Sequence, residues 1–217
     1  GGTSANAGSD KQTYYRLNPT SKDDSALNMA KDLFSGGCMH GDIALIEAAL
    51  SIREFYHLVE CGVPFPQTRY GAYPGYQTDH DTAGRGTSAG PKTSMLMVEK
   101  LLDEATAAGV TILDNVRVVE LLTEGAASHK RIAGLICIDA ENRMMVTRSD
   151  YVVYGTGGPG GLYADSVYPG SQTGSLGIAL KAGAKAQNLT ESQFGIASTG
   201  FPWNLDRKST RLNSSHY

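Results

Sequence analysis

Residues 150–161 read Asp150-Tyr151-Val152-Val153-Tyr154-Gly155-Thr156-Gly157-Gly158-Pro159-Gly160-Gly161, and this stretch predicts the fold class of the chain. A short run of β-branched and aromatic residues passes directly into a turn with five glycines in seven residues. Glycine has no Cβ, so its backbone can turn sharply and still approach a bulky ligand. Open α/β sheets use such a turn after a strand to present backbone N–H groups to a phosphate or a flat cofactor. A tight turn without a ligand is the competing interpretation, and the rest of the chain decides between the two.

The composition excludes several classes of protein. The chain has 217 residues, 41% of them hydrophobic, which is enough for one large or two small domains with a core. Its net charge of −3 indicates no basic surface for nucleic acid, and no stretch approaches the roughly 20 apolar residues of a membrane span. The three cysteines, Cys38, Cys61 and Cys137, are widely spaced without a CxxC pair, which favours free thiols in a reducing compartment over a zinc site. We therefore expect a cytoplasmic α/β protein.

Helical periodicity predicts four helices, over Ser25–Leu33, Asp42–Cys61, Pro91–Ala108 and Thr173–Ala186. A glycine directly follows the second and another follows the third, and glycine is a typical helix stop. In the second helix, apolar residues near helical spacing predict the buried face: Ile43, Ile46, Ala49, Leu50, Phe55 and Leu58.

Between the third and fourth helices the periodicity changes to that of strands. Short strands are predicted over Thr111–Leu113, Val116–Leu122, Ile132–Asp139 and Met144–Arg148, separated by Asp-Asn, Glu-Gly and Glu-Asn turns. This pattern predicts an antiparallel β-meander that leads into a strand at Tyr151–Tyr154 and the glycine turn. Leu189–Ile196 predicts a further strand, whereas Pro64–Gly90 has no period and predicts a long loop.

Both ends of the chain are unusual. It starts in the glycine-rich segment GGTSANAGSD without a methionine, which predicts that residue 1 is an interior position of a longer gene product. Asp206–His216 reads DRKSTRLNSSH and matches, in frame, the translation of a common sequencing adapter. We therefore expect a partial domain over residues 1–205 and a non-native tail over residues 206–217.

Four features follow one another in a fixed order: the glycine-rich start, a helix before a meander, Gly155-Thr156-Gly157-Gly158, and a small-residue helix followed by Ser192-Gln193-Phe194. As a set they resemble the flavoprotein subunit family of fumarate reductase and succinate dehydrogenase, which includes L-aspartate oxidase. The resemblance covers residues 1 to about 199. It implies a partial dinucleotide-binding, glutathione-reductase-like FAD domain with an antiparallel meander, and an FAD-dependent oxidoreductase that passes hydride between the flavin and an organic small molecule.

The resemblance also implies which residues contact FAD. The first glycine turn is similar to the family's turn around the flavin, and Thr3 stands where covalently flavinylated members carry a histidine, which implies non-covalent FAD. The second glycine turn is similar to the family's segment near the pyrophosphate and ribityl chain. The implied cofactor-binding residues are Gly1, Gly2, Thr3, Ser4, Ala7 and Gly8 at the flavin, Val118 at the adenine, Gly155, Thr156, Gly157 and Gly158 at the pyrophosphate, and Gln193 beside the flavin ring.

The chain departs from the family at two places that bear on catalysis. Gly195 stands where the family has a substrate-side histidine, and Gln172–Gly177 lacks the family's acidic residue. No catalytic residue is assigned, and this chain alone is expected to be inactive. Two alternatives stay open: a degenerate flavin-binding homologue without catalysis, and an NAD(P)- or nucleotide-binding α/β protein with the same glycine turns.

Three further patterns favour structural interpretations. Asp79-His80-Asp81 has no third ligand at metal spacing and is interpreted as a solvated turn rather than a metal or acid–base site. Ser94 near Lys92 and Lys100 lies at a helix start without a nucleophile elbow, so a serine hydrolase is not favoured. Lys11 and Arg16 fit an anion-steering pair and surface charges equally well.

Overall fold

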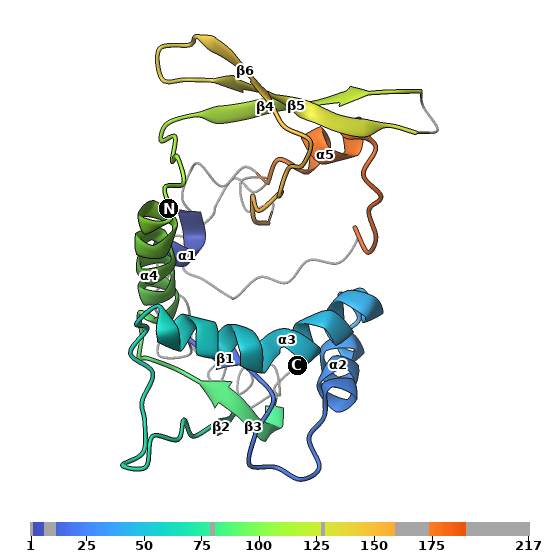
Figure 1. The fold of residues 1–217 in the computed structure, drawn as a ribbon. Coiled ribbons are helices and arrows are strands. Elements are labelled where there is room, and N and C mark those ends of the chain that lie inside the picture. Colours follow the sequence, from blue (N-terminus) through green and yellow to red (C-terminus); the bar gives the residue numbers. More distant parts are fainter. Residues whose placement is uncertain (1, 7–11, 79–80, 127–128, 159–173, 190–217) are drawn as a thin grey trace, which may run out of the picture. The chain divides into compact units, whose positions relative to one another are not determined.

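The computed structural model describes residues 2–6, 12–78, 81–126, 129–158 and 174–189. The chain divides into two units, Gly1–Gly109 with Asn188–Tyr217, and Val110–Gln187, and each unit is described by itself. Figure 1 labels their helices and strands.

The first unit contains two helices, α2 and α3, that lie side by side (Figure 1). Helix α2 spans Ala26–Ser35, and the Ser25 hydroxyl caps it by accepting the Asn28 N–H at 3.1 Å. Helix α3 spans Gly41–Glu60 and is capped by the His40 ring, which accepts the Asp42 N–H. Both helices were predicted from the sequence, and the helix expected over Ser25–Leu33 extends by two residues to Ser35.

The buried face of α3 differs from the predicted one. The buried residues repeat at spacings of four and three along the helix, and they are Ala44, Ala48, Ser51, Phe55 and Leu58. Ile43 and Ile46 are 52% and 58% exposed, and Leu50 is exposed as well. Ala49 is exposed too, so the prediction was right at Phe55 and Leu58 and wrong at the other four residues. The reason is that α2 packs on the alanines of α3, where small side chains let two helices approach closely.

The second half of α3 packs into an aromatic cluster. Phe55 is fully buried, and its ring centroid lies 4.8 Å from that of Phe65 and 5.2 Å from that of Tyr73. Tyr14 adds a third ring at 6.0 Å from Phe55. Such offset and edge-to-face pairs add to the gain from area burial. This cluster joins α3 to the sheet that contains Tyr14.

That sheet has three antiparallel strands in the order β1-β3-β2, namely β1 Tyr14–Tyr15, β3 Asp81–Thr87 and β2 Tyr76–Thr78. Its strands β2 and β3 lie inside the segment predicted to be a loop over Pro64–Gly90, so that prediction was wrong there. These strands contain small and polar residues, so the sequence lacks the pattern expected of a strand. The close approach of the strands requires small residues at these positions. At Gly75, an added Cβ would lie 2.0 Å from the Gly84 carbonyl oxygen, so the backbones meet at a distance that only glycine permits.

Two further helices complete the described part of the first unit. Helix α4 spans Thr93–Ala107, and Gly109 follows its C-cap Ala108 with a φ of +77°, the left-handed conformation that glycine adopts easily. This agrees with the predicted helix and its stop. Helix α1, Gly2–Asn6, is a single turn that contacts α4. The glycine-rich start is therefore a helical turn over these residues.

The second unit is built on the predicted antiparallel meander, in the order β4-β5-β6 (Figure 1). The strands are β4 Arg117–Glu124, β5 Arg131–Ile138 and β6 Met144–Arg148. Helix α5 spans Leu176–Ala182 and packs on β4, and it is shorter than the predicted Thr173–Ala186 helix.

Two predicted strands of the second unit are absent from it. Neither Thr111–Leu113 nor Tyr151–Tyr154 is a strand, and Val153 is 97% exposed. β-propensity expresses how well a side chain fits a paired, half-buried surface. Within the described residues neither segment has a ladder partner, and this explains both wrong predictions. The strand predicted over Leu189–Ile196 lies, apart from Leu189, outside the described residues.

None of the helices in the described ranges is long and apolar enough to cross a membrane.

The difference between the two faces of α3 predicts unequal costs for two truncations. Phe55→Ala should lower the free energy of unfolding by about 3–5 kcal/mol, because it leaves a cavity in the aromatic cluster. Ile46→Ala, in the same helix, should change it by less than about 0.5 kcal/mol, because the side chain is exposed. Urea denaturation followed by far-UV circular dichroism measures both, and an equal loss in the two variants would contradict the assignment of the buried face.

Candidate functional site

Three of the predicted flavin-contact residues, Gly2, Thr3 and Ser4, lie on α1. Gly2 begins this helical turn with a φ of +75°, Thr3 is half-buried and Ser4 is exposed. Gly1, Ala7 and Gly8 lie outside the described residues. The part of the turn that can be described therefore places Gly2, Thr3 and Ser4 in consecutive helical positions.

A side-chain amide then ties the chain that follows α1 to the start of α4. The Gln12 Oε1 atom accepts the Ser94 N–H at 2.8 Å and also the Ser94 hydroxyl. The N-cap residue of α4, Lys92, makes no side-chain capping bond, so Gln12 supplies a partner for one of the open N–H groups of this helix. Ser94 is thus a structural residue at a helix start, in line with the interpretation against a hydrolase.

The predicted cofactor residues of the second unit lie on β4 and on the segment after β6. Val118 is half-buried and pairs with Cys137 of β5, next to an irregularity in the ladder between Val118 and Glu120. Residues 155–158 are exposed and have no regular secondary structure, and Gly157 has a φ of +77°. A Cβ added at Gly155 or Gly158 would meet no atom within 4 Å. Gln193 lies outside the described residues.

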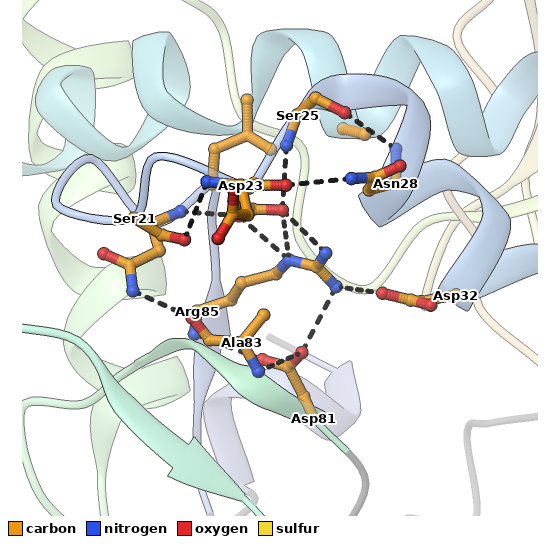
Figure 2. A network of polar contacts seen from close by, with 12 residues as sticks. Ser21, Asp23, Ser25, Asn28, Asp32, Asp81, Ala83 and Arg85 are labelled. Carbon is orange, nitrogen blue, oxygen red and sulfur yellow. Dashed lines mark hydrogen bonds and ion pairs between the residues drawn. The ribbon is translucent and has the colours of Figure 1, made fainter.

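A polar network in the first unit surrounds Arg85 of β3 (Figure 2). The Arg85 side chain is only 5% exposed and is therefore buried. Its guanidinium lies 2.7 Å from Asp24, 2.6 Å from Asp32 and 3.2 Å from Asp81. The Asp24 side chain is only 2% exposed, whereas that of Asp32 is 65% exposed. A buried guanidinium needs such partners because it cannot lose its charge.

The hydrogen bonds of this network shift two pKa values in opposite directions. Burial raises the pKa of Asp24, but the hydrogen bonds from Arg85 and from the Asn18 N–H outweigh it and bring the pKa below its usual value. The hydrogen bond with Asp24 is the largest cause that raises the pKa of Arg85. Both groups therefore carry their charges at neutral pH, and the network acts as a structural ion cluster.

Arg16 was interpreted as a surface charge or an anion-steering residue, and the structure corrects the first of these. It is 2% exposed, donates to the Tyr73 carbonyl at 2.6 Å and lies 4.5 Å from the centroid of the Phe55 ring. Burial lowers its pKa.

The remaining predicted patterns resolve into structural groups. Asp81 is an ion-pair partner of Arg85, while Asp79 and His80 lie outside the described residues. Among the residues that the structure places, no group of three or more His, Cys, Asp or Glu could hold a metal ion. The three cysteines are free, and burial raises the pKa of Cys137, which disfavours its thiolate.

A family model described as FAD binding domain matches residues 1–205. The chain belongs to this family. The predicted cofactor, FAD, and the predicted α/β FAD-binding fold are thereby confirmed.

Relatives and solved structures agree with this membership of the FAD binding domain family. L-aspartate oxidase from Bacillus subtilis (strain 168) is 28% identical over 177 residues, which cover 80% of this chain and 32% of the relative. The chain of a mutant Escherichia coli quinol fumarate reductase, FrdA, superposes with a TM-score of 0.67 at 20% identity over 81% of this chain and 30% of that chain. The Sdh1 complex of Mycobacterium smegmatis in the apo form gives a TM-score of 0.66 at 20% identity, over 82% of this chain and 33% of that chain.

The similarity to these two structures shows a shared fold. The chain spans about a third of the length of the curated relative that it matches.

The Arg85 network predicts a large difference between two arginine substitutions. Arg85→Met should lower the free energy of unfolding by about 3–5 kcal/mol, because it leaves buried carboxylates uncompensated. Arg53→Met is the matched control: Arg53 is 81% exposed and pairs with Glu54 at 3.7 Å, so its loss should cost at most about 1 kcal/mol. Chemical denaturation measures both.

A double variant separates the ion pair from general packing. Adding Asp24→Asn to Arg85→Met should cost less than the sum of the two single substitutions, because each removes the charge that the other leaves unpaired. Additive costs would show that the two groups do not stabilise the protein as a pair.

Proposed function

We propose that this chain contributes the FAD-binding residues of an oxidoreductase that transfers hydride between the flavin and a small organic molecule. The observation that carries the proposal is the match of the FAD binding domain family over residues 1–205. The matched relative and the FrdA structure are named as an oxidase and a reductase, which supports redox chemistry. When bound, FAD supplies that chemistry, while the protein positions it and tunes its electronics.

In the second unit, the turn over Gly155, Thr156, Gly157 and Gly158 binds the pyrophosphate and ribityl chain through its backbone. The described geometry fits this role, because the turn is exposed and a Cβ at Gly155 or Gly158 would meet open space. The left-handed φ of Gly157 lets successive N–H groups converge, as anion-binding turns require. Val118, on the meander strand β4, contacts the adenine.

In the first unit, the glycine-rich start binds the flavin itself. Gly2, Thr3 and Ser4 lie on consecutive positions of α1, and Gly1, Ala7 and Gly8 belong to the same segment of sequence. No side chain in α1, GTSAN, has a nitrogen nucleophile like that of histidine, so FAD is held without a covalent bond there. Gln193 lies beside the flavin ring.

Domain and compartment are proposed on the same basis. Residues 1–205 are the part matched by the family model and form part of an FAD-binding domain, while residues 206–217 are the adapter-derived tail. Three free thiols support a reducing, cytoplasmic environment. The substrate is a small molecule. The competing hypothesis is a degenerate homologue that binds flavin without catalysis, and an activity assay distinguishes it from an oxidoreductase.

A titration with FAD tests the proposed binding function. The protein is expressed from the complete reading frame that contains these residues, and flavin fluorescence is followed as FAD is added. Saturable binding is expected. Gly157→Ala should weaken it about ten-fold, because a Cβ strains the left-handed backbone by about 1–2 kcal/mol and shifts the turn.

Gly71→Ala is the matched control for this titration. Gly71 has a φ of +78°, close to that of Gly157, and lies in a loop of the first unit where a Cβ would also meet no atom within 4 Å. It should lose similar stability and keep its FAD affinity. Lack of FAD binding by the unsubstituted protein would reject the proposal.

The mode of attachment is tested on the same holoprotein. Acid precipitation should release the yellow chromophore into the supernatant, because Thr3 has no imidazole nitrogen with which to bond the flavin. A pellet that stays yellow after repeated washing would show a covalent link and contradict the proposal.

A further inference from the structure

The residue directly before the glycine turn makes a hydrogen bond that bridges a long stretch of sequence. The Tyr154 hydroxyl donates to the Ser175 carbonyl oxygen at 2.5 Å, across 21 residues. Tyr154 is half-buried, whereas Tyr151, three residues earlier in the same segment, is 88% exposed. Tyr154 is therefore anchored by its side chain at a point where the backbone carries no ladder hydrogen bonds.

Ser175 is itself held in an unusual conformation. It is the N-cap of α5 and has a φ of +42° and a ψ of +16°, in the left-handed region that a residue with a Cβ rarely adopts. Its side chain makes no capping hydrogen bond to the helix. Its carbonyl accepts both the Ile178 N–H at 3.2 Å and the Tyr154 hydroxyl, so Tyr154 binds at the junction where α5 begins.

Helix α5 is in turn attached to the strand that carries Val118. It packs on β4, and Lys181 forms an ion pair with Glu120 at 2.8 Å. Glu120 lies two residues from Val118 on β4, beside the ladder irregularity. Contacts from Tyr154 through Ser175 and α5 thus connect the glycine turn to the strand proposed to meet the adenine, all within the second unit.

We propose that Tyr154 is a positioning residue for FAD: its hydroxyl fixes the start of the Gly155–Gly158 turn relative to α5 and β4. This inference rests on the proposed function, because it assumes that the turn contacts the cofactor. Glycines leave a turn with many accessible conformations, and binding has to select one of them. A tyrosine anchored at the start of the turn reduces the number of accessible conformations before FAD binds, so that binding loses less conformational entropy.

The test compares two substitutions that each remove one hydroxyl from the same segment. Tyr154→Phe removes the donor to Ser175, and Tyr151→Phe removes a hydroxyl from an exposed ring. Both proteins and the unsubstituted protein are made from the complete reading frame. FAD affinity is measured by flavin fluorescence, the geometry of the bound flavin by visible circular dichroism at saturating FAD, and the stability of the apoprotein by its melting temperature.

Tyr154→Phe is expected to raise the Kd for FAD about five-fold, as the loss of one net hydrogen bond allows, and to change the visible circular dichroism of the bound flavin. Tyr151→Phe should match the unsubstituted protein in both measurements. The visible circular dichroism distinguishes positioning of FAD from a simple loss of stability, because it reports the geometry of the bound flavin at saturating FAD.

Three results would overturn the inference. One is an unchanged Kd and flavin spectrum for Tyr154→Phe. This includes the case in which only the melting temperature falls, because the role of the hydroxyl would then be purely structural. Another is an equal effect of both substitutions. The third is lack of FAD binding by the unsubstituted protein, which would reject the proposed function as well, whereas the first two leave it intact.

Discussion

The buried guanidinium of Arg85 is the interaction on which the architecture of the first unit depends. It projects from β3 and pairs with Asp24 before α2, Asp32 on α2 and Asp81 at the start of β3. Removing a guanidinium from water is costly unless its donors are satisfied, so the sheet and α2 keep the relative position at which these carboxylates meet it. Asp24 also accepts the Asn18 and Ser25 N–H groups, at 2.9 Å and 3.0 Å. The same carboxylate that pairs with Arg85 therefore orders the residue that caps α2.

The positions of α2, α3 and α4 were predicted well and the buried face of α3 poorly, and α3 shows why. Periodicity and a following glycine are local properties, and they located α3 to within one residue at each end. Which stripe faces inward depends on the neighbour. The stripe with the larger apolar residues, Ile43 and Ile46, is exposed, while Ala44 and Ala48 are buried. A rule based on hydrophobic size predicts the wrong buried face where two helices approach through small residues. Close approach there adds van der Waals contacts that stabilise the protein more than burial of one large side chain does.

Strands were predicted in the meander, where partners are adjacent in sequence and the residues favour strands, but not in the sheet of β1, β2 and β3. Strands β4, β5 and β6 form hairpins with short turns, so the whole pattern is visible in one segment. Strand β3 pairs both with β2, directly before it in the sequence, and with Tyr14 and Tyr15, about 70 residues away, and its glycines serve close backbone approach rather than turns. Tyr151–Tyr154 shows the opposite error, since its residues favour a strand but the described residues supply no partner. Pairing, more than propensity, decides strand formation here.

The same distinction applies to the candidate site. The glycine turn could be found from the sequence because its key property, the left-handed φ of Gly157, belongs to one residue. The bond from Tyr154 to Ser175 could not, because it depends on where α5 begins in space. A site that recognises a ligand through backbone groups constrains few side chains. The chain superposes on the FrdA structure with a TM-score of 0.67 at 20% sequence identity, so the backbone path is shared although most residues differ. The anchoring role proposed for Tyr154 rests on a contact between residues far apart in the sequence, and such contacts are found only in the folded structure.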